Sequence, residues 1–445
     1  MNPVPRAEKP EPPPGTSDPE TAATTTPAPA ATNAAPPTPL PTPGRIRARV
    51  VGLMGPAFVA AVAYVDPGNF ATNVESGARF GFLLLWVVLT ANVVAMLLQY
   101  LSAKLGIATG RSLPELCRER YPRPVVWGLW FQAEIVVIMT DLAEFIGGAV
   151  ALNLLFGLPM LHGGILIAVA SFVVLAVRSA RHRRFEAAIT ALLAIVAGAF
   201  LYQTLSATVA PADVAGGLVP RFDGPASLLL AAGIVGATVM PHAVYLHSAL
   251  TQERFAGVRE PERGTLLRAQ RLDVVLAMGV AGLVNMAMLV SAASLLHGTG
   301  AEPTLHGAFS AFAEGSGPLT ALLFGIALLA SGLASSSVGV YAGQIVMQGF
   351  LRRRVPLWVR RLVAVVPALA VLAFGVDPTH ALVVSQVVLS FGIPFALVPL
   401  VLLTRRADVM GAWANRRATT LAAAAASVVI IALNVVLVTL AVPSL

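Results

Sequence analysis

The chain has 445 residues, of which 56% are apolar and only 12% are charged, and its mean hydropathy is +0.77. An ordinary soluble domain carries about a quarter charged residues, so this composition excludes a soluble globular protein. Lys and Arg outnumber Asp and Glu by 30 to 22, a net charge of +8. No basic block lies beside an aromatic surface, which argues against a nucleic-acid partner. The single cysteine, Cys117, excludes an intramolecular disulfide and a cysteine-based metal site.

Residues 1–44 contain 14 prolines together with runs of Ala and Thr. This segment has too little bulky apolar surface to offset the entropy lost on folding, so we predict a disordered cytoplasmic tail. It lacks the charged start, apolar core and cleavage site of a secretory signal. We expect the first apolar run, from about Val50, to act as an uncleaved insertion signal.

Eleven apolar runs follow the tail, each near the length of about 20 residues that a helix needs to cross a bilayer. The sequence therefore predicts an all-α integral membrane protein with eleven transmembrane helices. The predicted limits are 48–79, 82–104, 124–154, 160–178, 184–209, 225–250, 272–297, 316–350, 357–376, 379–404 and 417–443.

Arginine and lysine orient these spans, because cytoplasmic segments of membrane proteins are enriched in both residues. With the N-terminus inside, 28 of the 30 basic residues fall in inner segments, and only Arg79 and Arg221 fall outside. We therefore expect a multi-pass protein of the plasma membrane with a cytoplasmic N-terminus and an extracytoplasmic C-terminus. The excess positive charge is explained by topology.

Two spans are interrupted near their middles by helix-breaking residues. Pro67 and Gly68 break the first span within residues 63–69, and Pro241 breaks the sixth within residues 237–242. Such breaks are tolerated in a membrane only where the freed backbone faces protein or a water-filled cavity. The alternative, two kinks that merely shape the bundle, does not require the acidic residue found at the first break.

The two broken spans are five helices apart, and five is odd. If helices 1–5 and 6–10 are copies of one unit, the second copy is inverted relative to the first. We predict one repeat over 45–209, a second over 210–404, and helix 11 with the C-terminus over 405–445. Corresponding broken helices in inverted repeats indicate a substrate site near the membrane midplane.

The residues at the breaks predict the chemistry of that substrate. Asp66 offers a carboxylate, Asn69 an amide oxygen, Met240 a thioether and Ala237 a freed carbonyl. Oxygen ligands alone suit Mg²⁺ or Ca²⁺, whereas a soft thioether favours later metals. The mixture indicates Mn²⁺ or Fe²⁺, with Cd²⁺, Co²⁺ or Ni²⁺ as further candidates, carried as substrate rather than held as a cofactor. Gln386 in span 10 is a further candidate ligand in one conformation.

Three acids lie along one stripe of the third span: Glu134, Asp141 and Glu144. Acids in a membrane face the protein interior, where they pair with cations or take up protons. Arg360 and Arg361, adjacent at the start of span 9, point about 100° apart, so each can meet a different acid. A structural ion-pair cluster and a proton route both fit this pattern.

Other polar residues in the spans are less specific. His242 and His247 are five apart and so do not form the same-face pair of a zinc protease, although either can titrate or gate. Asn92 and Gln99, seven residues apart on one face of span 2, predict interhelical hydrogen bonds. Residues 335–337, three serines, predict close helix packing.

Four segments of the sequence are distinctive when taken together. They are Asp66-Pro67-Gly68-Asn69, Met240-Pro241-His242, Thr140-Asp141-Leu142-Ala143-Glu144, and Ala342-Gly343-Gln344-Ile345-Val346-Met347 with Gly349-Phe350. They resemble the Nramp (natural resistance-associated macrophage protein) family of proton-coupled divalent metal importers, and the resemblance runs from about residue 46 to the C-terminus. The resemblance implies a LeuT-type fold with helices 1 and 6 unwound. One departure is Gln348, where many members are expected to have Glu.

The resemblance also implies roles for individual residues. It implies metal binding by Asp66, Asn69, Met240 and the Ala237 carbonyl, joined in outward or occluded states by the Ala63 carbonyl and Gln386. It implies a proton route from Asp66 through Glu144 and Asp141 to Arg361, with Glu134 and Arg360 beside it and His242 and His247 lining the nearby space.

The leading interpretation is an importer of divalent metals, not an enzyme, whose partners are metal ions, protons and the lipid bilayer, with no obligate protein partner. The alternatives are a symporter of a small organic substrate, an intramembrane metal-dependent hydrolase and a passive channel. Asp66 would repel the carboxylate of an organic substrate at the half-helix N-terminus. The histidine spacing and the lack of an activated nucleophile argue against the hydrolase.

Overall fold

In the computed structural model, each predicted span is mostly helical where the structure describes it, apart from the two breaks and a few residues at the span ends. The described part of the chain consists of helices and their connections. The structure describes residues 55–178, 182–206, 209–257, 260–353 and 355–441. The predicted tail, 1–44, and the start of the first predicted span lie outside these residues. The described residues all belong to the unit Arg47–Leu445.

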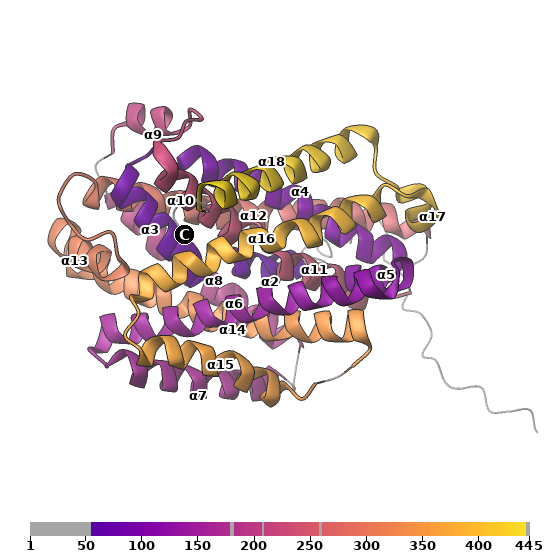
Figure 1. The fold of residues 1–445 in the computed structure, drawn as a ribbon, viewed down its shortest axis with the longest axis horizontal. Helices are drawn as coiled ribbons and strands as arrows, with labels where there is room; N and C mark the ends of the chain where they lie inside the picture. Colours follow the sequence, from indigo (N-terminus) through magenta and orange to yellow (C-terminus); the bar gives the residue numbers. More distant parts are fainter. Residues whose placement is uncertain (1–54, 179–181, 207–208, 258–259, 354, 442–445) are drawn as a thin grey trace, which may run out of the picture. The chain divides into compact units, whose positions relative to one another are not determined.

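Eleven helical segments correspond to the eleven predicted spans within the described chain (Figure 1). In order they are α2 (Pro56–Val62) with the 3-10 turn η2 (Ala63–Val65) and α3 (Pro67–Phe80), α4 (Leu85–Thr109), α6 (Arg123–Phe156), α7 (Met160–Arg178), α8 (His182–Ser206), α10 (Gly224–Thr238) with α11 (Pro241–Arg254), α12 (Glu260–Leu296), α14 (Pro318–Leu351), α15 (Leu357–Ala373), α16 (Pro378–Thr404) and α18 (Arg417–Ala441). The connections contain α5 (Leu113–Arg120), α9 (Pro211–Gly217), α13 (Leu305–Ser316), α17 (Ala407–Met410) and η3 (Gly411–Trp413).

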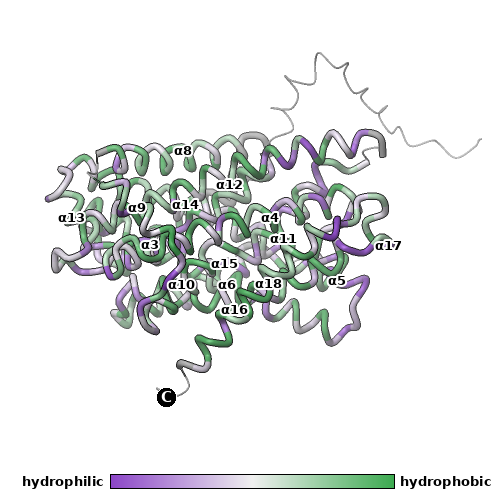
Figure 2. Tube along the Cα trace, turned by 90° about the horizontal axis from the view of Figure 1, so that it is seen from above, coloured by the Kyte–Doolittle hydropathy of each residue, from purple (hydrophilic) through white to green (hydrophobic). Residues whose placement is uncertain are grey.

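The bundle has the surface of a membrane protein. Among the described residues, eight helices are long and apolar enough to cross a bilayer by length and composition. Large apolar side chains point outward, including Phe131 (61% exposed), Trp358 (62%) and Phe374 (85%). Figure 2 shows apolar residues along most helices and a strongly hydrophilic segment at α17. Outward-facing apolar side chains over this many helices indicate contact with lipid.

The broken helices lie inside the bundle. The half-helix α3 packs against α12, α10 and α16, and α11 packs against α4 and α14. The helix α6 packs against α14, α16, α7 and α15 and thereby connects the inner helices to the outer ones. Because the half-helices are enclosed, the polar groups at their breaks meet protein rather than lipid, as the bilayer requires.

The N-terminus of α2 is fixed by an acid on α12. The backbone N–H of Gly55 donates to both carboxylate oxygens of Asp273, at 3.3 and 3.2 Å, and that of Ala57 donates to one of them at 3.1 Å. The side-chain amide of Gln270 donates to the same carboxylate at 2.8 Å. A carboxylate at this position satisfies N–H groups that have no partner within the helix.

Candidate metal site and charged cluster

The first break is built around Asp66. Its backbone is extended (φ −85°, ψ 171°), and Pro67 then begins α3 with its fixed φ and missing N–H. The carboxylate of Asp66 caps α3, accepting hydrogen bonds from the backbone N–H of Asn69 at 2.8 Å and from its side-chain amide at 2.7 Å. Both side chains are buried. One carboxylate oxygen of Asp66 thus caps the N-terminus of α3. The other, Oδ2, has no hydrogen-bond partner among the described residues.

Two residues that sequence analysis missed satisfy the carbonyls freed by this break. The side-chain amide of Asn285, on α12, donates to the Tyr64 carbonyl at 2.7 Å, and the hydroxyl of Ser331, on α14, donates to the Val65 carbonyl at 2.5 Å. Asn285 was detectable as an isolated amide within the apolar span 272–297. Ser331 carried no comparable signal, because serine is common inside membrane helices.

The second break is less polar. The helix α10 ends at Thr238, α11 begins at Pro241, and Met240 between them is extended (φ −80°, ψ 116°) and fully buried. No side chain caps the start of α11. The side-chain amide of Asn69 donates to the carbonyl of Ala237 at 3.0 Å and so connects two breaks that are 168 residues apart in the chain.

Gln386, on α16, lies between the two breaks. A methyl group on Gly68 would come within 2.0 Å of its side-chain nitrogen, and a methyl group on Gly236 would come within 1.9 Å of its backbone carbonyl oxygen. The side-chain oxygen of Gln386 is buried and accepts no hydrogen bond within the described chain. Ala63 is buried in η2, on the other side of Asp66 in the chain.

The contact between Asn69 and Ala237 places the oxygen donors of the first break beside the second break, where Met240 is buried. The described residues contain no group of three or more His, Cys, Asp or Glu side chains arranged to hold a metal ion. A site at the breaks therefore depends on one carboxylate, neutral amide and carbonyl oxygens, and a thioether. Such a donor set suits an ion that is bound and released, since it carries a single full negative charge.

The charged cluster lies between α6, α14 and α15. Arg360 forms a two-pronged ion pair with Glu134, at 3.1 and 3.0 Å. Arg361 lies 4.0 Å from the Asp141 carboxylate and 4.9 Å above the centre of the Phe145 ring, and it is only 2% exposed. The two adjacent arginines thus meet different acids, as their angular separation predicts.

Small residues of α14 provide space for the cluster. A methyl group on Gly339 would lie 3.1 Å from a carboxylate oxygen of Asp141 and 3.1 Å from one of Glu144, so both acids face this glycine. Arg361 also donates to the carbonyl and the hydroxyl of Ser336. The predicted role of serines 335–337 in packing thus omitted a hydrogen bond to a buried cation.

The two histidines connect to different partners. The Nδ1 atom of His242 lies 3.3 Å from the hydroxyl of Thr140, the residue before Asp141. The Nδ1 atom of His247 lies 2.7 Å from the side-chain oxygen of Gln99, whose amide donates to the hydroxyl of Tyr64 beside the first break. Because an amide oxygen only accepts, Nδ1 of His247 carries the proton in this contact. The interhelical bond predicted for Gln99 is confirmed, whereas the side-chain oxygen of Asn92 is buried and has no hydrogen-bond partner among the described residues.

Comparison with known sequences gives a consistent assignment. The model of the family described as Nramp, natural resistance-associated macrophage protein-like, matches residues 57–440. The chain is 51% identical to a protein of Deinococcus radiodurans over 388 residues, covering 87% of this chain and 89% of that one. It is 55% identical to a protein of Mycobacterium tuberculosis over 392 residues, covering 88% and 92%. Both are named divalent metal cation transporter MntH.

Solved structures agree on the fold. A crystal structure of the Eremococcus coleocola manganese transporter superposes with a TM-score of 0.80 at 30% identity, covering 89% of this chain and 88% of that one. MhsT, in complex with L-phenylalanine, superposes with a TM-score of 0.56 at 13% identity over 85% of this chain and 98% of that one, which supports the LeuT-type fold alone. By sequence and by architecture, this chain belongs to the Nramp family.

Proposed function

We propose that this protein imports divalent transition-metal ions, Mn²⁺ or Fe²⁺ first among them and also Cd²⁺ and Co²⁺, together with protons. The observation that carries the proposal is the buried connection from the Asp66 carboxylate through the Asn69 amide to the Ala237 carbonyl. It brings a charged ligand and a freed carbonyl together where two helices are broken. The relatives named as divalent metal and manganese transporters support it.

In this proposal Asp66, Asn69, Met240 and the Ala237 carbonyl bind the metal. Rotation of the Asn69 amide turns its oxygen, rather than its nitrogen, toward the ion. The Ala63 carbonyl and Gln386 join when the site is closed from one side. The position of Gln386 between Gly68 and Gly236 supports this role. The metal is the substrate, and the proposal includes no resident cofactor.

The proposed proton route begins at Asp66 and continues through Glu144 and Asp141 to Arg361. The two acids face the same glycine of α14, and Asp141 lies beside Arg361. The ion pair of Glu134 with Arg360 flanks this route, and His242 and His247 line the space nearer the breaks. Arg361, which lies 4.0 Å from the Asp141 carboxylate, ends the proposed route.

We place the protein in the plasma membrane with its N-terminus in the cytoplasm and its C-terminus outside. The distribution of arginines supports this orientation. The proposal involves no nucleic acid and no obligate protein partner. The relatives' names argue against the hydrolase, and the acid at the first break argues against an organic anion as substrate.

The test is uptake of labelled Mn²⁺ into proteoliposomes that contain a pH-sensitive dye. We expect metal entry accompanied by internal acidification, and loss of both in Asp66→Ala. The matched control is Asp213→Ala, because Asp213 is an exposed acid on α9. Metal entry without acidification would indicate a channel, and neither signal in the unmodified protein would reject the proposal.

A second variant separates the proton route from the metal site. We expect Glu144→Gln to slow acidification more than metal entry, because it removes a proton acceptor without removing a metal ligand. If Glu144→Gln slows metal entry and acidification equally, the assigned proton route is rejected, whereas the assignment of the metal ligands is not affected.

A further inference from the structure

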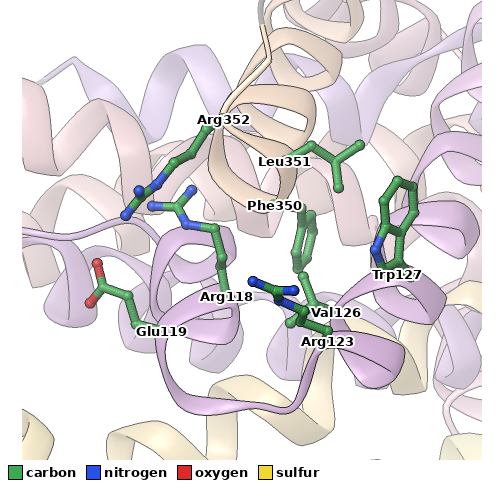
Figure 3. Close-up of a pocket in the computed structure, with 8 residues that line it drawn as sticks. All are labelled: Arg118, Glu119, Arg123, Val126, Trp127, Phe350, Leu351 and Arg352. Atoms are coloured by element: carbon green, nitrogen blue, oxygen red, sulfur yellow. The ribbon is translucent and has the colours of Figure 1, made fainter.

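A pocket of about 420 Å³ lies between the corner joining α5 to α6 and the C-terminal end of α14. Three arginines line it: Arg118 from α5, Arg123 from the first turn of α6, and Arg352 at the end of α14. Apolar side chains, including Trp127 and Phe350, line the remainder. Figure 3 shows the three guanidinium groups directed toward the same space, with Trp127 at its margin. The pocket thus combines a basic part with an apolar part.

Acids offset the positive charge of this pocket only in part. Glu119 is the one acid in its lining, and it forms an ion pair with Arg111 at 3.4 Å. Within the described chain, no side-chain hydrogen bond or ion pair is made by Arg123 or Arg352. Arg118 donates to the carbonyls of Gln348, at 3.2 Å, and Gly349, and its Nε–H is buried without a partner there. Burial, and next the adjacent Arg352, lower the pKa of Arg118.

The backbone adds to this preference for an anion. The helix α6 begins in the pocket with Arg123, and no side chain caps it, so its positive dipole end lies at the same place. Pro124 has no N–H, which leaves the free N–H groups of Arg123 and Val125 at this end. Arg352 has a φ of 56°, and among the described residues it is the one non-glycine residue with positive φ. It is the C-cap of α14, and its backbone N–H donates to the Gln348 carbonyl. Figure 3 shows its side chain directed toward Arg118.

The surroundings of the pocket indicate that its anion belongs to a lipid. Trp127 is 52% exposed, and Val125 and Phe131 on α6 are also exposed. These side chains form an apolar surface that continues from the pocket along a transmembrane helix. Tryptophan is enriched at the level of lipid headgroups, where an amphipathic ring contacts both phases. A soluble anion needs no such apolar surface, whereas the acyl chains of a phospholipid pack against one.

We propose that this pocket binds the phosphate of an anionic membrane phospholipid. Arg123, Arg352 and the free Arg118 Nε–H contact the lipid headgroup, and Trp127 contacts an acyl chain of the lipid. The site is distinct from the metal site and does not depend on it. Basic pockets between transmembrane helices bind anionic headgroups through charge-assisted hydrogen bonds, and two or more contacts give selectivity over a zwitterionic lipid. Arg118 additionally connects the occupied site to the last carbonyls of α14.

The test is native mass spectrometry of the full-length protein in detergent, with phosphatidylglycerol or phosphatidylcholine of identical chains. We expect at least about a tenfold preference for phosphatidylglycerol in the unmodified protein, and loss of that preference in the double variant R123Q/R352Q. The matched control is R353Q/R405Q, which removes two exposed arginines that do not line the pocket. Gel filtration of each variant, with a single symmetrical peak, establishes that it is folded.

Three outcomes would overturn the proposal. One is an unmodified protein that retains both lipids equally. Another is equal loss in the two double variants, which would reflect total charge rather than this pocket. The third is displacement of phosphatidylglycerol by excess glycerol 3-phosphate, which would assign the pocket to a soluble phosphate. Retention of phosphatidylglycerol by R353Q/R405Q but not by R123Q/R352Q would establish the site.

Discussion

The two helix breaks occupy corresponding places in the sequence but are supported differently. At the first, Asp66 caps α3, and the freed carbonyls of Tyr64 and Val65 accept hydrogen bonds from other helices. At the second, no side chain caps α11, and the carbonyl of Ala237 is bonded by Asn69 of the first break. The first break therefore has its own polar framework, and the second takes much of its position from the first.

The two breaks differ because positioning a buried carboxylate and positioning a thioether make different demands on the surrounding protein. A carboxylate must be fixed accurately, because a buried charge is costly unless its partners are in place. A thioether is soft and weakly directional, so its position requires packing rather than hydrogen bonds. The packing at the second break is close, since Gly236 lies against the backbone of Gln386. In the proposed metal site, the first break thus contributes a charged carboxylate, and the corresponding second break contributes a polarizable thioether.

The largest effect is expected from removing the charge of the first break alone. Asn is as good a helix cap as Asp, so Asp66→Asn should leave the thermal stability in detergent nearly unchanged. Metal uptake should nevertheless fall more than about a hundredfold, since a buried charge interaction of about 3 kcal/mol or more is lost. Uptake by Asp213→Asn should be normal. Near-normal uptake by Asp66→Asn would show that the carboxylate is not a metal ligand.

The next effect tests the close approach at the second break. Gly236→Ala places a methyl group 1.9 Å from a backbone oxygen, which cannot rotate away. We expect the free energy of unfolding to fall by about 1–3 kcal/mol and uptake to fall with it. The control is Gly216→Ala on α9, where a methyl group meets nothing within 4 Å. Thermal unfolding of both variants measures the difference, and equal stability would mean that the two half-sites are not packed this closely.

A smaller effect, on selectivity, is expected at Met240. Without the thioether, Met240→Ala should lose discrimination against hard ions, so that Ca²⁺ inhibits Mn²⁺ uptake at about a tenfold lower concentration, or about 1.4 kcal/mol. Met278→Ala, which truncates a fully buried methionine on α12, controls for lost packing. An unchanged inhibition profile would remove Met240 from the set of ligands.

The smallest effect concerns the polar framework of the first break. Ser331→Ala removes the hydrogen bond to the Val65 carbonyl and should cost about 1 kcal/mol of stability. Ser337→Ala is the matched control, because the Ser337 hydroxyl bonds only to the Leu333 carbonyl of its own helix among the described residues. If both variants unfold at the same temperature, the framework does not support the break.

Much of the fold was predictable because its signals are local. Pro67 and Pro241 each interrupt a span, although Pro367, Pro394 and Pro399 lie inside helices. The apolar runs have the length that a bilayer requires. The hydrogen bonds from Asn285 to the Tyr64 carbonyl and from Ser331 to the Val65 carbonyl were not predictable. A single sequence does not reveal which face of one helix packs against another. For the same reason Ser336 was interpreted as packing, although it binds the cation of Arg361. The ligand roles of Asp66 and Met240 stay predictions from residue chemistry and family resemblance.

The attachment of α2 through Asp273 has a mechanical consequence. This half-helix spans only Pro56–Val62, and its far end leads into the break rather than into a continuous helix. Three backbone hydrogen bonds to one carboxylate therefore tie its first residues to α12, in addition to its packing against α8, α11 and α14. A rotation of α2 that is independent of α12 must break all three bonds. We therefore expect the two helices to move together as one rigid unit.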